Sequence, residues 1–108
     1  MTKVHVIKEK ENFKEIHVKG HAGFSGYGND VVCSAVSMLV INTVNAIEKY
    51  TDDAFKLEAD EEQGNIDIIF TEKVSHDTDL LVRTMLLGIS ETEKNYGEKY
   101  VSFTLEEV

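Results

Sequence analysis

The chain has 108 residues, with 20 acidic and 11 basic side chains and a formal net charge of −9. Because a chain of this length can bury roughly two thirds of its unfolded surface, we expect residues 1–108 to form a single domain rather than a disordered segment. The charge is uneven: residues 1–29 carry +2 and residues 30–108 carry −11. Such an acidic body disfavours binding to the phosphate backbone of nucleic acids.

Cys33 is the single cysteine, which excludes an internal disulfide and favours a reducing compartment, the cytoplasm. The first residues contain no apolar run of the ~7–15 residues typical of a secretory signal. The longest stretch without a charge, residues 31–47, is interrupted by polar side chains and is shorter than the ~20 apolar residues of a membrane span. We therefore expect neither a signal segment nor a membrane segment.

The first half of the chain predicts a β-hairpin followed by a helix. Residues 3–8 and 13–19 are rich in β-branched side chains and are separated by a short charged turn. From Val31 to about Tyr50, apolar residues recur every three or four positions, which predicts a helix. Asp30 stands directly before this pattern and is a favourable N-cap. Apolar residues on its other faces, Met38 among them, predict burial on more than one side.

The second half predicts another hairpin and another helix. Residues 55–59 and 66–70 alternate with period two and are joined by a polar loop that contains a glycine. A second helix is expected from about Asp77 to Tyr96, with Ser75 or Asp77 as its N-cap. Gly88 in its interior costs about 1 kcal/mol relative to alanine or marks close packing against a neighbour.

A last strand is predicted at residues 100–105, where Val101, Phe103 and Leu105 alternate with polar residues and are expected to be buried. The element order is therefore ββαββαβ. Hairpins that alternate with helices favour an α+β (α/β two-layer) fold, in which one mixed sheet packs against two helices.

The segment between the first hairpin and the first helix is unusually rich in glycine. Such a loop allows a backbone to approach a ligand closely, and it begins beside a histidine and ends near the only cysteine. We expect it to be a mobile, substrate-facing loop, formed by Gly20, Gly23, Phe24, Gly26, Tyr27 and Gly28.

A helix that begins after Asp30 would place Cys33 in its first turn, where unpaired N–H groups favour a thiolate. The backbone N–H groups of Cys33 and Ser34 are then candidates to stabilise a tetrahedral oxyanion. His21 is a candidate general base and acid for the thiol. Asp30 either caps the helix, which we favour, or also orients His21.

Simpler interpretations of the same residues stay open. A lone cysteine in an apolar helix is often a small buried hydrophobe, and a histidine between glycines is often an ordinary loop residue. The chain lacks both glycine-rich phosphate-binding motifs. His17 and His21 are four residues apart on a strand end, and Cys33 has no partner thiol. The sequence therefore predicts no metal site and no cofactor.

Two motifs carry a resemblance to a known family. Gly20-His21-Ala22, a glycine-rich loop and Asp30-Val31-Val32-Cys33-Ser34-Ala35-Val36-Ser37 together resemble the bacterial ribosomal-processing cysteine protease Prp family. The element order and the length of the chain fit as well. Val31 in place of isoleucine and Ser34 where alanine is frequent are mild departures that remove no catalytic group.

The resemblance implies a cytoplasmic, homodimeric thiol protease without a cofactor, which takes part in ribosome biogenesis. Members remove a short N-terminal extension from a large-subunit ribosomal protein, number twenty-seven of the bacterial series, and cleave after an aromatic residue. The family's catalytic pair matches His21 and Cys33, its aspartate matches Asp30, and its loop covers the site until the peptide enters.

A second hypothesis from another class is a non-catalytic ribosome-assembly module that grips a basic ribosomal protein through its acidic surface. It predicts that function survives Cys33→Ala but is lost when the charges of Asp52-Asp53 or Asp60-Glu61-Glu62 are reversed. Its binding would also depend more strongly on salt than recognition through an apolar pocket does.

Overall fold

A computed structural model describes residues 2–20, 27–60, 65–97 and 99–108 of the chain, and for residues 27–31 it describes the backbone only. It contains two helices and five strands, in the order β1 (Thr2–Glu9), β2 (Asn12–Lys19), α1 (Tyr27–Tyr50), β3 (Phe55–Asp60), β4 (Asn65–Phe70), α2 (His76–Tyr96) and β5 (Val101–Glu107). This is the predicted order ββαββαβ.

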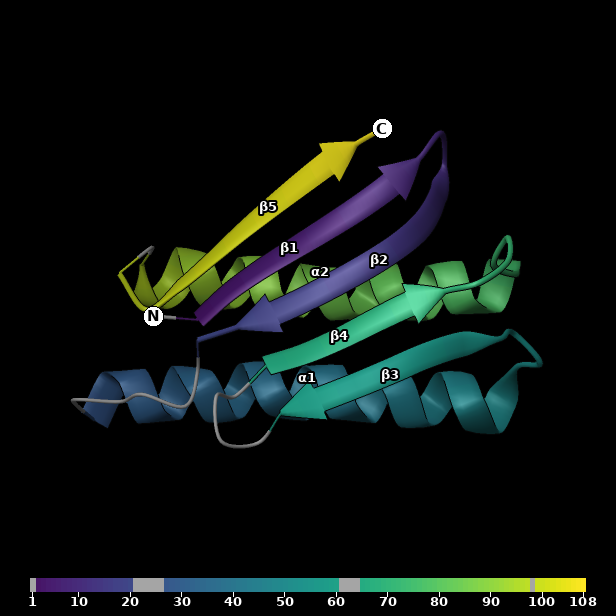
Figure 1. Cartoon of the computed structure of the whole chain (residues 1–108). Helices are drawn as coiled ribbons and strands as arrows, with labels where there is room; N and C mark the ends of the chain where they lie inside the picture. The colour runs from purple at the N-terminus through teal and green to yellow at the C-terminus, as the bar shows by residue number, and fades with distance from the viewer. Residues whose placement is uncertain (1, 21–26, 61–64, 98) are drawn as a thin grey trace.

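The five strands form one mixed sheet in the order β3-β4-β2-β1-β5. β1 pairs in parallel with β5, and the other neighbouring strands are antiparallel. Both helices lie behind the same face of the sheet, so the molecule has two layers and one uncovered sheet face (Figure 1). The predicted α+β architecture is confirmed.

The alternation of side chains along the strands separates the two faces of the sheet. Val4 and Val6 of β1 are buried against the helices with Ile16 and Val18 of β2. The residues between them, which include two histidines, point to the uncovered face because neighbouring strand residues face opposite sides. Thr2 has the parity of Val4 and is fully buried on the helix side.

The start of α2 confirms the sequence prediction. Ser75 is the N-cap, and its side chain accepts a hydrogen bond from the backbone N–H of Thr78. Asp53, which precedes β3, accepts bonds from the Ser75 backbone N–H at 3.0 Å, from the Ser75 hydroxyl at 2.6 Å and from the Thr78 hydroxyl. These contacts tie the start of α2 to the segment that follows α1.

The start of α1 differs from the prediction. The helix begins at Tyr27, four residues before the predicted start at Val31, so Tyr27 and Gly28 belong to the helix and not to the loop. Asp30 lies inside the first turn and is not the N-cap. The sequence pattern did not predict this turn because its residues do not continue the apolar period. The helix can include them because extending an existing helix costs far less than nucleating one.

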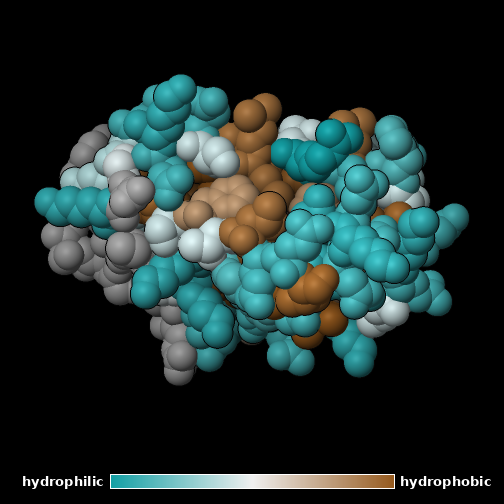
Figure 2. Space-filling view, turned by 90° about the horizontal axis from the view of Figure 1, so that it is seen from above, coloured by the Kyte–Doolittle hydropathy of each residue, from teal (hydrophilic) through white to brown (hydrophobic). Residues whose placement is uncertain are grey.

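Two further predictions of burial are wrong. Met38 and Ile41 of α1 are 73% and 52% exposed, so this helix is not buried on all of its apolar faces. Leu105 is 55% exposed because β5 is an edge strand that diverges from α2 toward its C-terminal end (Figure 1). The view from above, toward the β5 side of the sheet, shows apolar residues near the middle of a largely hydrophilic surface (Figure 2).

Gly88 marks a close contact between the helices. A Cβ atom at this position would lie 3.0 Å from Cδ1 and 3.2 Å from Cδ2 of Leu39 on α1. The sequence allowed close packing as one explanation of this glycine, and the structure supports it. Within the described ranges, neither helix is apolar enough over a sufficient length to cross a bilayer.

Candidate active site

Cys33 lies where α1 passes over the start of β1. Its side chain is 6% exposed, and its Sγ atom is 3.1 Å from Oγ1 of Thr2. The two groups share a hydrogen bond for which either can supply the proton. If the sulfur is a thiolate, only the Thr2 hydroxyl can donate, so Thr2 is positioned to orient and stabilise the nucleophilic form.

Thr2 is held rigidly by the end of the sheet. Its backbone N–H donates to the carbonyl oxygen of Tyr100 at 2.9 Å, and Thr2 pairs with Val101 of β5 in the parallel ladder. The sequence analysis did not single out this residue. The sequence did contain a signal, because Thr2 has the same parity in β1 as the buried residues Val4 and Val6. A hydroxyl that is buried at such a position needs a hydrogen-bond partner.

The early start of α1 also changes the prediction for oxyanion donors. Cys33 is the seventh residue of the helix and Ser34 the eighth, so both lie in its second turn. Beyond the first four residues of an α-helix, each N–H donates to the carbonyl four residues earlier. The backbone N–H groups of Cys33 and Ser34 are therefore engaged in the helix and are not free to hold an oxyanion.

The loop that carries the other predicted residues is described only at its start. Gly20, directly after β2, has φ +83°, a left-handed conformation that favours glycine. A residue with a side chain at this position would be strained. The predicted loop and catalytic residues His21, Gly23, Phe24 and Gly26 lie outside the described residues.

The three described histidines lie elsewhere. His17 contacts Asp67 at 2.6 Å and Glu15 at 2.8 Å on the uncovered face of the sheet. Partial burial alone would lower the pKa of His17, but its hydrogen bonds to these carboxylates outweigh burial and raise the pKa above 6.5. His5 points to the same face, away from Cys33, and His76 is exposed at the first residue of α2. In the described parts of the chain, no three His, Cys, Asp or Glu side chains are grouped to hold a metal ion.

Comparison with known proteins relates this geometry to a class of enzymes. Residues 1–102 match the family model described as cysteine protease Prp. A curated relative from Staphylococcus aureus, the ribosomal processing cysteine protease Prp, is 26% identical over 92 residues, which cover 85% of this chain and 87% of the relative.

Two solved structures have the same fold. The crystal structure of SMU.848 from Streptococcus mutans is 31% identical, with a TM-score of 0.87, and the match covers 100% of this chain and 96% of that protein. The ribosomal processing protease Prp from S. aureus, solved with a substrate peptide, has a TM-score of 0.92 at 23% identity. That match covers 98% of this chain and 100% of the other.

The fold and the family match together define a cysteine peptidase. The chain belongs to the cysteine protease Prp family, since the family model covers nearly its whole length.

Proposed function

We propose that this protein is the endopeptidase that removes the short N-terminal extension of a large-subunit ribosomal protein, number twenty-seven of the bacterial series. The relatives from S. aureus and Bacillus subtilis are both named as ribosomal processing cysteine proteases, which supports a ribosomal protein as the substrate. The choice of this ribosomal protein follows the resemblance carried by the two motifs. The proposal includes action in the cytoplasm as a homodimer, for which the exposed apolar side chains on both helices, such as Met38 and Leu87, offer a surface.

One observation carries the choice of nucleophile. A cysteine protease attacks with a thiolate, and this chain has a single cysteine, so the nucleophile is Cys33. Its hydrogen bond to the Thr2 hydroxyl supports this role, because a purely space-filling cysteine needs no polar partner.

The choice of His21 as general acid and base follows from its place in the chain. His21 is two residues after Lys19, which pairs with Lys3 at the end of β1 beside Thr2. Two residues span at most about 7 Å, and this short distance along the chain from the sheet end where Thr2 contacts Cys33 supports His21 as the partner of the thiol. His5 and His17 face the side of the sheet opposite to Cys33. His21 is therefore the best candidate for the general acid and base.

The proposed reaction proceeds in two steps. The Cys33 thiolate attacks the scissile carbonyl carbon, and the C–N bond breaks as protonated His21 gives its proton to the leaving amine. Neutral His21 then takes a proton from water, which attacks the thioester carbonyl carbon. The C–S bond breaks with its electron pair on sulfur, which releases the extension with a new C-terminal carboxyl group and restores the Cys33 thiolate beside protonated His21. The ribosomal protein with its new N-terminus is already released in the first step.

The burial of Cys33 bears on how this reaction starts. Attack requires the carbonyl carbon to approach the sulfur to about 3–3.5 Å, and a thiol that is 6% exposed is closed to a peptide. Substrate binding must therefore be coupled to a change that uncovers the thiol. Such coupling protects a reactive cysteine from unselective reaction between turnovers.

The test is cleavage of the ribosomal protein with its extension, followed by mass spectrometry. We expect wild type to release the extension, and Cys33→Ala and His21→Ala each to lower kcat/KM by at least ~10³-fold. His76→Ala is the matched control and is expected to cleave as wild type does, and circular dichroism checks that each variant is folded. Undiminished cleavage by Cys33→Ala would overturn Cys33 as the nucleophile. Binding of the ribosomal protein by wild type without any cleavage would overturn the protease and favour the non-catalytic binding module.

A further inference from the structure

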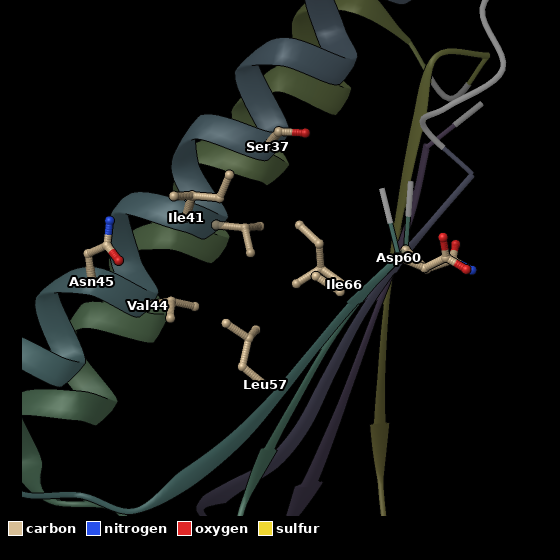
Figure 3. A pocket seen from close by; sticks show the side chains of 10 residues that line it. Ser37, Ile41, Val44, Asn45, Leu57, Asp60 and Ile66 are labelled. Carbon is tan, nitrogen blue, oxygen red and sulfur yellow. The ribbon is translucent and has the colours of Figure 1, made fainter. Parts of the chain in front are cut away.

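An apolar groove with a volume of about 290 Å³ lies between α1 and the hairpin formed by β3 and β4. In Figure 3, Ile41 and Val44 of α1 face Leu57 and Ile66 of the hairpin across this groove. Ile41 is 52% exposed and Leu57 is 48% exposed, although both are large apolar side chains. Apolar side chains that converge on an open groove are typical of a binding site.

The groove continues the face of α1 that carries Cys33. Ser37 lines its near end, and residues four apart lie on the same helix face, so Ser37 is one turn beyond Cys33. Ile41 is one further turn along. At 1.5 Å per residue, Ile41 is about 12 Å from Cys33 along the helix axis.

This separation selects the part of a substrate that would reach the groove. An extended peptide advances about 3.3–3.6 Å per residue, so 12 Å corresponds to about three to four residues. A side chain at the scissile bond would be too near Cys33 to fill the groove.

The neighbouring strand offers a backbone partner for such a peptide. β3 is at the end of the sheet order and pairs on one side with β4, which leaves its other edge open among the described strands. An open edge can bind an extended peptide through main-chain hydrogen bonds, while alternate side chains enter pockets. Leu57 and Ala59 face the helix side, because they pair with buried Ile68 and Ile66.

We propose that this groove is a specificity subsite that binds a large apolar side chain of the peptide substrate, three to four residues from the scissile bond. The peptide runs extended between the open edge of β3 and the face of α1. The inference rests on the proposed function, because it takes Cys33 as the nucleophile. A peptide fits this position better than a second copy of the chain, since a second copy seated along this face would block the approach to Cys33.

The test is an alanine scan of a peptide that spans the junction of the extension. The peptides compared carry leucine or alanine three or four positions from the cleaved bond. With wild type, alanine is expected to raise KM roughly 10- to 100-fold, as for loss of one buried apolar side chain. The same peptides, bound to Cys33→Ala and measured by fluorescence anisotropy, should show an equal loss of affinity without any chemistry.

Groove variants locate the effect on the enzyme. Ile41→Ser and Leu57→Ser both change exposed positions. With either variant enzyme, the KM values of the apolar peptide and the alanine peptide should differ by less than about threefold. Leu105→Ser is the matched control. It removes a leucine of similar exposure from β5, at the other end of the sheet order, and does not line the groove, so it should keep the full discrimination.

The outcomes separate the two proposals. If wild type cleaves the junction but Ile41→Ser and Leu57→Ser discriminate as wild type does, the subsite is overturned and the proposed function stands. If these variants convert a dimer into a monomer in sedimentation without altering the scan, a second copy covers the groove and the subsite is again overturned. If wild type neither binds nor cleaves the peptide, both proposals fail.

Discussion

The two helices cover the same sheet face, yet their sequences obey different rules. α2 has a side-chain cap, acidic residues in its first turn, one buried stripe and a C-terminal Gly97 with φ +99°. The cap and the acidic first turn stabilise the start of a helix, and glycine tolerates the positive φ at its end. α1 has a first turn with no apolar pattern, a buried polar contact at Cys33 and exposed apolar residues at Met38 and Ile41.

This difference separates stability from function. α2 departs from local rules at Gly88, where the approach of Leu39 explains it, and at Leu87, which is exposed although it is apolar. α1 departs from them at the nucleophile and along the groove, which are the places where a peptide would bind. Departures from sequence–structure consistency are expected at functional sites, and those of α1 coincide with the nucleophile and the groove.

The largest expected effect on stability comes from breaking the contact between the helices. Gly88→Val adds a branched side chain where even a Cβ atom would be 3.0 Å from Leu39. We expect a loss of about 1–3 kcal/mol in the free energy of unfolding, measured by urea denaturation. Ser90→Val, at an exposed position of the same helix, is the control for the helix propensity of valine. Equal losses in both variants would show that the contact is not tight.

A smaller effect is expected at the start of α2. Asp53→Ala removes the acceptor for the Ser75 backbone N–H and for the hydroxyls of Ser75 and Thr78, and should cost about 1 kcal/mol. Asp52→Ala, an exposed neighbour, is the control and should be nearly neutral.

The same variant has a defined pH dependence. Partial burial would raise the pKa of Asp53, but hydrogen bonds from Ser75 and Thr78 outweigh burial and lower it below 3.8. A carboxyl whose pKa is lowered by folding contributes stability above its unfolded pKa and loses that contribution as the pH falls through the folded value. The difference in stability between wild type and Asp53→Ala should therefore be full at pH 7 and shrink below pH 3.8. A difference independent of pH would exclude an electrostatic contribution.

The smallest effect is expected at Thr2, where the consequence falls on catalysis. Thr2→Val keeps the shape and strand preference of the side chain but removes the hydroxyl beside Cys33. Loss of one hydrogen bond worth about 0.5–1.5 kcal/mol should lower kcat several-fold and leave KM unchanged. Thr2→Ser should restore most of kcat.

Thr43, a buried threonine on α1, serves as the comparison for Thr2. The Thr43 hydroxyl donates to the carbonyl oxygen of Leu39 at 2.7 Å and does not contact Cys33. Thr43→Val should therefore leave kcat unchanged. A fall in kcat as large as that of Thr2→Val would mean that general loss of packing, and not the bond to the thiol, lowers the rate.

The sequence predicted the strands and α2 well because their signals are local. Period two in β1 and β2 separates buried Val4 from the residues of the uncovered face, and Ser75 stands where a capping residue is required. The start of α1 was mispredicted because Gly28 and Asn29 are poor helix formers. Leu105 was mispredicted because strand alternation does not say how far a covering helix extends.

The sequence by itself determined the element order, the single cysteine and the resemblance that predicted a cysteine protease, because these depend on residue type, spacing and short-range preference. The tertiary structure decided which residue contacts the thiol, since Thr2 and Cys33 are 31 positions apart and meet only when α1 packs on β1. It also decided that Ile41 and Leu57 line an open groove. No local pattern distinguishes an apolar side chain that is buried in the domain from one that is exposed in a groove, because only the packing between distant elements makes that difference.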